Sequence, residues 1–326
     1  MHTSGKPSRF WETVMGIITL IRLPNLMILA LIEWLLRICV IGPFLFNGNP
    51  QYMSTWADYA LLMAATIFLA AGGYVINDYF DVRIDRINKP NHVVVSRTIA
   101  SRIAIKLHIT LSSLSVLLGI YLAWRIQSFW FGLLFPCLAF SFWFYSTGWK
   151  HLLVWKNLIV ALLAAVLIFL VWLFEFLHLR LNAGYFAGAI PKLSEVSWIF
   201  LAYGCFAFLV TLFREIIKDM EDIQGDRQFG TRSIPSVIGI PWSKALVVGA
   251  ILVTMGILGY CQLVILRFDL EWLFWYLAAA VQLPALILII IVLLAARKPQ
   301  FRLASGIAKA IMLTGILSML FLRFSP

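Results

Sequence analysis

The sequence predicts an all-α, polytopic membrane protein with about nine transmembrane helices. Apolar residues make up 62% of its 326 positions and charged residues only 13%, whereas a soluble domain needs more charged surface to stay in solution. Several apolar runs approach the roughly 20 residues that a helix needs to cross a bilayer core of about 30 Å. Basic residues also collect at alternate turns between these runs, which is typical of a multi-pass protein.

Apolar runs between charged or Pro/Gly-containing breaks predict nine helices. These cover residues 14–42, 57–80, 104–124, 127–146, 157–175, 197–217, 243–266, 271–295 and 303–322. The first run contains Arg22 and Pro24, and we expect it to bend at the proline, which lacks a backbone N–H. Glu33 and Arg37 in the same run are spaced for an i,i+4 pair and are interpreted as structural. The amphiphilic stretch 176–196 is expected at a membrane interface.

The formal charge of +11 is distributed unevenly between the two ends of the predicted helices. With the N-terminus inside, the cytoplasmic side receives Lys6, Arg9, Lys150, Lys156, Arg297, Lys298, Arg302 and the stretches Arg83 to Lys106 and Arg214 to Lys244. The opposite side receives only Arg125, Arg180, Lys192, Arg267 and Arg323. This asymmetry satisfies the positive-inside rule for a cell-membrane protein and explains the excess charge without a nucleic-acid partner. No small-residue cleavage site follows the basic N-terminal segment, so we expect no removable signal peptide.

We expect one transmembrane domain, residues 1–326, with pseudo-repeat halves of roughly 14–150 and 157–322, each containing one acidic segment. Eight of the fifteen acidic residues lie in these segments, NDYFDVRID and REIIKDMEDIQGD. Aspartates recur in both with a spacing of three and then four residues: Asp78, Asp81 and Asp85 in the first, and Asp219, Asp222 and Asp226 in the second. On a helix this spacing places three carboxylates on one face.

A row of carboxylates is self-repelling unless a cation neutralises it. Oxygen ligands favour a hard ion, and Mg²⁺ is usually held by a few carboxylates together with substrate phosphates. Neither segment has the twelve-residue calcium-loop pattern, and the histidines and cysteines show no zinc or haem spacing. A single acidic cluster is explained equally well by a helix end in water. Two clusters with one spacing favour a cytoplasmic Mg²⁺ site with two facing halves.

Basic residues lie beside both aspartate clusters, and this combination suits a diphosphate. They are Arg83, Arg86 and Lys89 in or just after the first segment, and Arg214, Lys218, Arg227 and Arg232 in or just after the second. Metal and guanidinium charges would make the diphosphate of an allylic substrate a good leaving group, because they stabilise the oxygen charge that develops as the C–O bond breaks. Aromatic faces can shelter the resulting carbocation until an acceptor attacks. The predicted partners are therefore a prenyl diphosphate and a lipophilic acceptor within membrane lipid, and we infer no obligate protein partner.

Both motifs resemble those of the UbiA-type intramembrane prenyltransferases, and the resemblance covers nearly the whole chain. The family's N-D-x-x-D-x-x-x-D motif is matched by Asn77, Asp78, Asp81 and Asp85, and its D-x-x-x-D motif by Asp222 and Asp226, with Asp219 one turn earlier. The resemblance implies a nine-helix bundle with a central cavity open to the cytoplasmic side and the lipid. It also implies that Asp78, Asp81, Asp85, Asp222 and Asp226 are catalytic and that these residues, Asn77 and Asp219 hold Mg²⁺.

Weaker family elements fall in the expected places and imply a set of substrate-binding residues. RLPN at Arg22 to Asn25 resembles an early R-P-x-N element, YSTGWK at Tyr145 to Lys150 resembles a tyrosine–lysine element, and GTRSIPSVIG follows the second motif. The residues implied to bind diphosphate or acceptor are Arg22, Asn25, Lys89, Tyr145, Lys150, Arg214 and Lys218. For Tyr145 and Lys150, membrane topology alone is an equally good explanation.

Within the family, NDYFDVRIDRINKPN and REIIKDMEDIQGD are most similar to the digeranylgeranylglyceryl phosphate synthases, with the chlorophyll synthases a near second. The former alkylate the free hydroxyl of a glycerol-phosphate ether lipid, which implies geranylgeranyl transfer to geranylgeranylglyceryl phosphate. After INKPN those enzymes continue R-P-I-P-S-G, whereas this chain has His92 to Arg97 as HVVVSR. An aromatic quinone precursor or a chlorin therefore stays open as the acceptor.

A cation-coupled secondary transporter is an alternative of another class, because two matching acidic segments in two halves are also expected where an internal repeat forms a cation site. Transporter sites lie near the membrane midplane on broken helices. The two aspartate clusters are predicted at helix ends among many bases, which favours the enzyme.

Overall fold

The computed structural model describes residues 9–46, 53–88, 93–148, 153, 155–229 and 232–323. Within these residues the chain is helical, and its one isolated β-bridge joins Val95 to Ile99 in a connection between helices. Nine segments of this part are long and apolar enough to cross a membrane. They are Leu23–Leu45, Trp56–Asn88, Ser101–Arg125, Phe129–Thr147, Trp155–Leu179, Ala183–Gln228, Ile234–Leu266, Glu271–Leu294 and Lys298–Leu322. The predicted all-α membrane class is confirmed.

The chain forms two compact units. The first comprises Met1–Ala30 and Trp56–Trp149, and the second Leu31–Thr55 and Lys150–Pro326. The first unit contains α1 (Arg9–Leu20), α4 (Trp56–Asn88), α5 (Ser101–Arg125) and α6 (Phe129–Thr147), while α2 (Leu23–Leu35) starts there and continues into the second. The second contains η1 (Leu36–Ile41), α3 (Gly42–Phe46), α7 (Trp155–Leu179), α8 (Ala183–Glu221), α9 (Ile223–Gln228), α10 (Ile234–Leu266), α11 (Glu271–Leu277), η4 (Ala278–Gln282), α12 (Leu283–Leu294), α13 (Lys298–Leu317) and α14 (Met319–Leu322).

The predicted first helix, 14–42, is broken rather than bent. Helix α1 ends at Leu20, the chain turns at Ile21 and Arg22, and α2 begins at Leu23. Pro24 explains the position of the break, because proline disfavours helical conformation in the residue before it and cannot continue the preceding helix. Arg22 adopts a φ of 54°, the left-handed conformation that closes the turn.

Both helices that carry an aspartate motif are longer than predicted. Helix α4 continues through the charged segment to Asn88, whereas the prediction ended at residue 80. Charge ends the apolar stretch but does not end the backbone hydrogen-bond ladder. Helix α8 starts at Ala183, so it includes most of residues 176–196, the stretch that was expected at a membrane interface. The Asn182 side chain caps this start by accepting the N–H groups of Gly184 and Tyr185.

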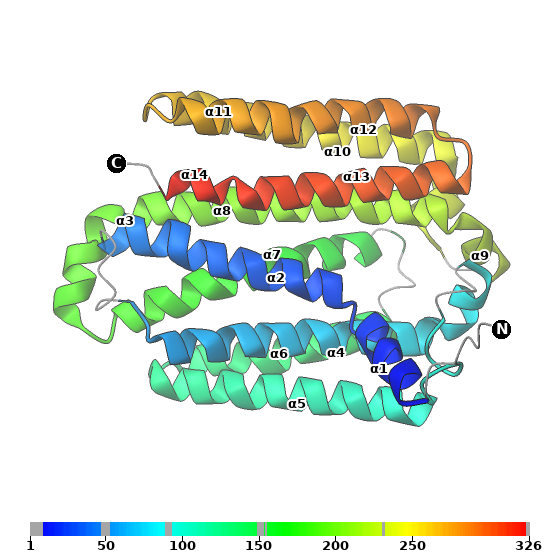
Figure 1. The fold of residues 1–326 in the computed structure, drawn as a ribbon, viewed down its shortest axis with the longest axis horizontal. Helices are drawn as coiled ribbons and strands as arrows, with labels where there is room; N and C mark the ends of the chain where they lie inside the picture. Colours follow the sequence, from blue (N-terminus) through cyan, green and yellow to red (C-terminus); the bar gives the residue numbers. More distant parts are fainter. Residues whose placement is uncertain are drawn as a thin grey trace, which may run out of the picture. The chain divides into compact units, whose positions relative to one another are not determined.

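Each unit is organised around its motif-bearing helix (Figure 1). In the first unit, α4, α5 and α6 pack against one another along their lengths. In the second, α8 is central and packs against α7, α10 and α13. Helices α7 and α8 come close at Gly204, where an added Cβ would lie 2.7 Å from the Phe169 ring. Each motif is therefore carried by a helix that packs against several other helices of its own unit.

The second unit contains a π-helical turn, η4, whose cause can be read from the sequence. Pro284 lacks the N–H that would bond to the Ala280 carbonyl. That carbonyl instead accepts the Thr314 hydroxyl from α13 at 2.7 Å. In a membrane an unpaired carbonyl is costly, so a neighbouring helix supplies the missing donor.

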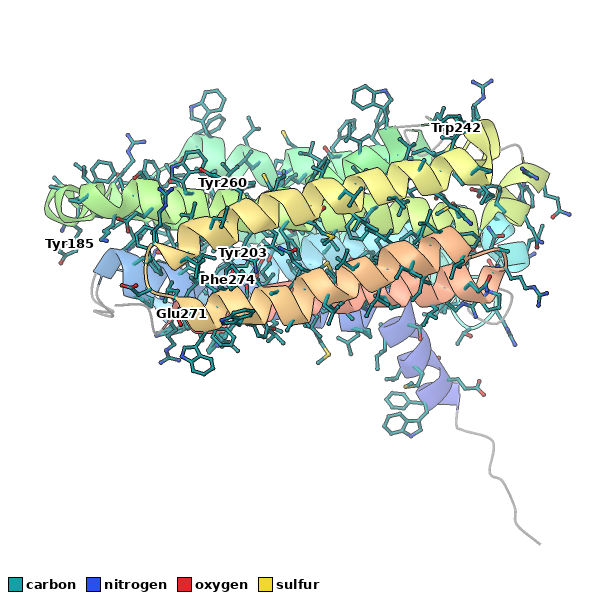
Figure 2. All side chains as sticks on the ribbon, turned by 90° about the horizontal axis from the view of Figure 1, so that it is seen from above. Tyr185, Tyr203, Trp242, Tyr260, Glu271 and Phe274 are labelled. Atoms are coloured by element: carbon teal, nitrogen blue, oxygen red, sulfur yellow. The ribbon has the colours of Figure 1, made fainter. Side chains whose placement is uncertain are left out.

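The two ends of α10 carry exposed aromatic side chains, with Trp242 toward its start and Tyr260 toward its end (Figure 2). Each is 70% exposed. Aromatic residues at both ends of one apolar helix are typical of a segment that meets two membrane–water interfaces. In contrast, Tyr203 on α8 contacts Ser318 inside the unit through a 2.8 Å hydrogen bond.

Candidate functional site

The first aspartate motif occupies the last three turns of α4. Asn77, Asp78, Asp81 and Asp85 are all half-buried on this uninterrupted helix. The predicted stacking of the carboxylates along one helical face is therefore confirmed for this motif. The intervening arginines, Arg83 and Arg86, are exposed, so they lie away from the packed side of the helix.

Arg22 contacts the first motif directly. Its Nη2 lies 2.6 Å from Asp78 Oδ1, and its guanidinium lies over the Tyr74 ring at 4.9 Å from the ring centroid. The turn between α1 and α2 presents this side chain, and Asn25 closes the turn by donating its backbone N–H to the Arg22 carbonyl at 2.8 Å. A fixed cation is thus held beside the aspartate row by residues more than fifty positions earlier in the chain.

A small apolar cluster supports this arrangement. Leu20 of α1 and Val75 of α4 pack with residues of the connection after the motif and with α5; the other buried members are Val95, Ile99 and Ala104. The cluster fixes α1 and the 93–100 connection against α4. Arg97 lies at the exposed tip of that connection.

Tyr145 lies near the end of α6 and is half-buried. The Phe142 ring of α6 lies against Gly73 of α4, where an added Cβ would approach it to 2.5 Å. On α6, Tyr145 follows Phe142 by about one helical turn. On α4, Asn77 follows Gly73 by about the same distance, so Tyr145 lies level with the start of the motif. The predicted residues Lys89, His92 and Lys150 lie outside the described residues.

The second motif differs from its prediction, because it does not lie on one continuous helix. Helix α8 ends at Glu221, Asp222 adopts a non-helical conformation, and α9 carries Asp226. Asp has low helix propensity because its short side chain competes for backbone hydrogen bonds, and Gly225 weakens the helix further. The break separates Asp219 from Asp226 by a change of helix, so a common carboxylate face is not formed here.

Asp219 is held by two residues at the start of α7. Lys156 Nζ lies 2.6 Å from its Oδ1, and Asn157 donates to its Oδ2 at 2.9 Å. Asp219 is only 5% exposed. Lys156 and Asn157 were not predicted as site residues, because their partner Asp219 lies more than sixty positions later in the chain. The only signal for them in the sequence is a pair of polar residues at the start of an apolar run.

Helix α13 supplies further bases to the second motif. Arg302 Nε lies 3.0 Å from Glu221 Oε1, and Lys298 Nζ lies 3.8 Å from Asp222 Oδ1. Asp226 is buried, and its Oδ2 has no hydrogen-bond partner among the described residues. A buried carboxylate oxygen of this kind is an unused acceptor, which suits a cation.

Arg214 and Lys218 lie on α8 before the motif and share one carboxylate. Glu215 Oε1 lies 3.2 Å from Arg214 Nη1 and 2.8 Å from Lys218 Nζ. The other two bases predicted around this motif, Arg227 and Arg232, are exposed. Among the described residues, no group of three or more Asp, Glu, His or Cys side chains has the geometry to hold one metal ion.

A comparison with protein-family models decides the class of this protein. The model described as the UbiA prenyltransferase family matches residues 36–309, which is most of the chain. The chain belongs to the UbiA prenyltransferase family. It is therefore a prenyltransferase, and family membership excludes the transporter alternative.

Curated relatives within the UbiA family include archaeal enzymes. Digeranylgeranylglyceryl phosphate synthase of Thermococcus sibiricus is 31% identical over 224 residues, which is 65% of this chain and 72% of that protein. The enzyme of the same name from Sulfurisphaera tokodaii is 31% identical over 204 residues, or 61% of this chain and 65% of that protein. The matched regions thus span about two thirds of each relative's own length.

Solved structures of UbiA proteins share the fold over almost the whole chain. A structure of digeranylgeranylglyceryl phosphate synthase matches with a TM-score of 0.60 and 21% identity, covering 96% of this chain and 99% of that one. A UbiA homologue from Aeropyrum pernix K1 matches at 0.56 and 20%, covering 90% and 97%. A UbiA homologue from Archaeoglobus fulgidus, bound to GPP and Mg²⁺, matches at 0.52 and 17%, covering 93% and 99%.

Proposed function

We propose that this chain transfers a geranylgeranyl group from its diphosphate to the free hydroxyl of geranylgeranylglyceryl phosphate, with Mg²⁺ as cofactor. The C–O bond to diphosphate breaks, the acceptor oxygen bonds to the freed carbon, and diphosphate and a proton are released. The observation that carries this proposal is the half-buried row of carboxylates on α4 with Arg22 paired to it. Carboxylates alone would repel a diphosphate, so the row requires cations to bind one.

The chemistry of the two motifs fits Mg²⁺. Their side-chain donors are carboxylate and amide oxygens, which hard cations prefer. Asp226 Oδ2 is a buried acceptor with no hydrogen bond among the described residues. We propose that Asn77, Asp78, Asp81, Asp85, Asp219, Asp222 and Asp226 hold the ions. Bound Mg²⁺ would share the negative charge of the leaving diphosphate.

The bases around each motif have a separate role in the proposal. Arg22 is fixed by Asp78 and by the Tyr74 ring, so its positive charge is held beside the motif. Arg214 and Lys218, held by Glu215, are the corresponding phosphate-binding cations of the second unit. Asn25, Lys89, Tyr145 and Lys150 complete the proposed substrate-binding set. Such pre-oriented donors stabilise developing charge without reorganising during the reaction.

The acceptor is proposed from the relatives. Those at 31% identity bear the name digeranylgeranylglyceryl phosphate synthase. The UbiA homologue bound to GPP and Mg²⁺ supports a prenyl diphosphate donor. We propose further that each motif lies on the cytoplasmic side of the cell membrane, because the loops beside both are rich in Lys and Arg.

The donor chemistry is tested with purified protein, geranylgeranyl diphosphate, geranylgeranylglyceryl phosphate and Mg²⁺. The expected result is a prenylated lipid and released diphosphate, with turnover lost on adding EDTA. Asp81→Ala and Asp222→Ala, one from each motif, are each expected to lose more than about a hundredfold in turnover, because each removes a proposed ligand of the Mg²⁺ that would stabilise the leaving group. Full activity in both variants would refute the mechanism.

The acceptor is tested in the same assay with a panel. Geranylgeranylglyceryl phosphate is compared with an aromatic quinone precursor and a chlorin at matched concentrations. Prenylation of the glyceryl phosphate lipid alone supports the proposal. Turnover only with an aromatic or chlorin acceptor would overturn the substrate assignment and leave the metal-dependent transfer intact.

A further inference from the structure

Helix α1 is an apolar helix that is too short to cross a membrane. It has 12 residues and is about 18 Å long at 1.5 Å per residue, whereas a bilayer core is about 30 Å thick. Only the two-residue turn at Ile21 and Arg22 separates it from α2, where the candidate membrane span Leu23–Leu45 begins. The helix therefore lies at the boundary where a membrane-spanning segment starts.

The two ends of α1 differ in how they pack. Near its C-terminal end, Leu20 is fully buried in the apolar cluster with Val75 of α4. Near its start, Phe10 and Trp11 are 68% and 59% exposed. Figure 2 shows this start of α1 extending away from α4. An apolar helix end that the described residues leave uncovered needs another apolar surface against it.

The exposed part of α1 has an apolar face and a polar face. Trp11, Met15 and Ile18 are spaced four and then three residues apart, so they form one row along the helix. Met15 is 58% exposed. Glu12 and Thr13, which lie off this row, are also exposed. An apolar row with a tryptophan beside a polar face is typical of a helix in the membrane–water interface, with its apolar side about 5–10 Å into the boundary between headgroups and acyl chains.

Helix α1 is joined directly to Arg22 through its last turn. The Ile21 N–H donates to the Ile17 carbonyl at 2.9 Å, and the Arg22 N–H donates to the Thr19 carbonyl at 3.1 Å. A change in the direction of α1 would therefore move the Arg22 side chain, whose Nη2 lies 2.6 Å from Asp78 Oδ1. The position of this helix and the contact at the first motif are mechanically linked.

We propose that α1 binds the lipid surface of the membrane through Trp11, Met15 and Ile18, and that this contact positions Arg22 against Asp78. Lipid is the occupant expected for this face, because the adjoining span places the turn at the membrane boundary and α1 is too short to cross. Trp11 and Ile18 are positioning residues, since they act through Arg22. The positioning role rests on the proposed function, whereas the lipid contact does not.

Fluorescence quenching tests the lipid contact without requiring catalysis. In full-length protein lacking the native cysteines, Met15→Cys and Thr13→Cys are each labelled with an environment-sensitive fluorophore and reconstituted into phosphatidylcholine–phosphatidylglycerol bilayers. Lipids with a spin label near the headgroup should quench the Met15→Cys label, and aqueous iodide should quench the Thr13→Cys label, because the two lie on the apolar and polar faces. The control Val253→Cys, exposed within the α10 span, should be quenched most by lipids with the spin label at the chain end.

Quenching of the Met15→Cys label mainly by iodide would place this face of α1 in water and overturn the proposal. Protection of that label from both quenchers would mean that protein covers the face, from a second copy or another segment of the chain, and would also overturn it. Quenching at the same depth as the Val253→Cys label would contradict an interfacial position.

Kinetics in the same bilayers tests the positioning of Arg22. Trp11→Gln combined with Ile18→Gln is expected to lower kcat/KM for geranylgeranyl diphosphate by about three- to tenfold, because the charge-assisted contact is weakened rather than removed. The conservative pair, Trp11→Phe with Ile18→Leu, should match the wild type. In an Arg22→Met background the glutamine pair should lower kcat/KM no further, since it acts through Arg22.

An equal loss from the glutamine pair in the wild-type and Arg22→Met backgrounds would indicate a general structural effect and overturn the positioning role. An unchanged kcat/KM in the wild-type background would overturn it as well. If the wild type shows no prenyl transfer, the proposed function fails, and the quenching result still decides whether α1 binds lipid.

Discussion

Arg22 combines a strained backbone with a charged contact. Its φ of 54° is unfavourable for a residue with a Cβ, by about 1–2 kcal/mol. The conformation directs the guanidinium to Asp78 and the Tyr74 ring. Strain of this kind persists where the surrounding structure enforces it, and it is concentrated at functional sites.

Replacing Arg22 with Met should lower kcat/KM for the prenyl diphosphate by about ten- to a hundredfold, because a charge-assisted contact beside the leaving group is lost. The thermal unfolding midpoint should change little. The matched control is Arg125→Met, which removes the cation paired with Asp58 at the opposite end of α4. Equal kcat/KM values for the two variants would contradict a role for Arg22 at the motif.

Arg37 has a structural role instead. It is 2% exposed, and its Nη1 lies 2.8 Å from Glu175 Oε1 and 2.8 Å from Ser54 Oγ. Ser54 also donates its hydroxyl and backbone N–H to Glu175. The cluster ties Ser54 to α7 and η1. The structural interpretation of Arg37 from sequence agrees with these contacts, whereas its partner on α7 was not anticipated.

Arg37→Met should destabilise the protein by about 3–5 kcal/mol, because it leaves the Glu175 carboxylate buried without its charge partner. The unfolding midpoint in detergent measures this loss. The double variant Arg37→Met, Glu175→Met should be more stable than the single variant, since no uncompensated charge remains. A single variant that unfolds at the wild-type temperature would refute a stabilising role for the pair.

Among the helices, α4 and α8 show how one sequence spacing gives two local structures. Both motifs have aspartates three and then four residues apart. Helix α4 continues through its motif, whereas the chain leaves helical conformation at Asp222. In the second unit Asp219 is bound by Lys156 and Asn157 on α7, so tertiary partners rather than helical periodicity set the carboxylate positions.

Close packing between α7 and α8 depends on Gly204. Gly204→Ala should lower the unfolding midpoint, with a cost of about 1–3 kcal/mol, because the new Cβ would overlap the Phe169 ring. Gly249→Ala on α10 is the control, since nothing lies within 4 Å of an added Cβ there and alanine is the better helix former. An equal or higher midpoint for Gly204→Ala would show that Phe169 moves aside freely.

For the whole molecule, the charge asymmetry predicts the orientation in the membrane. Arg267 and Arg297 flank the candidate span Glu271–Leu294, and both are exposed. In a variant lacking the native cysteines, Arg267→Cys should react with a membrane-impermeant maleimide in intact cells, and Arg297→Cys only after lysis. The reversed pattern would place the N-terminus and both motifs outside.

Sequence alone determined the membrane class, the approximate span positions and the alignment of the aspartates in the first motif. The apolar runs are long enough to dictate helices in a solvent that cannot satisfy backbone groups. Helical periodicity then suffices to align Asp78, Asp81 and Asp85, because all three lie on α4.

The tertiary structure decided everything that depends on residues distant in the chain. It paired Arg22 with Asp78 and bound Asp219 to Lys156 and Asn157. No spacing in the sequence encodes these contacts, because they arise from how helices pack. The break at Asp222 was also not predicted, because a spacing of three and then four residues aligns aspartates only where one helix continues through all of them.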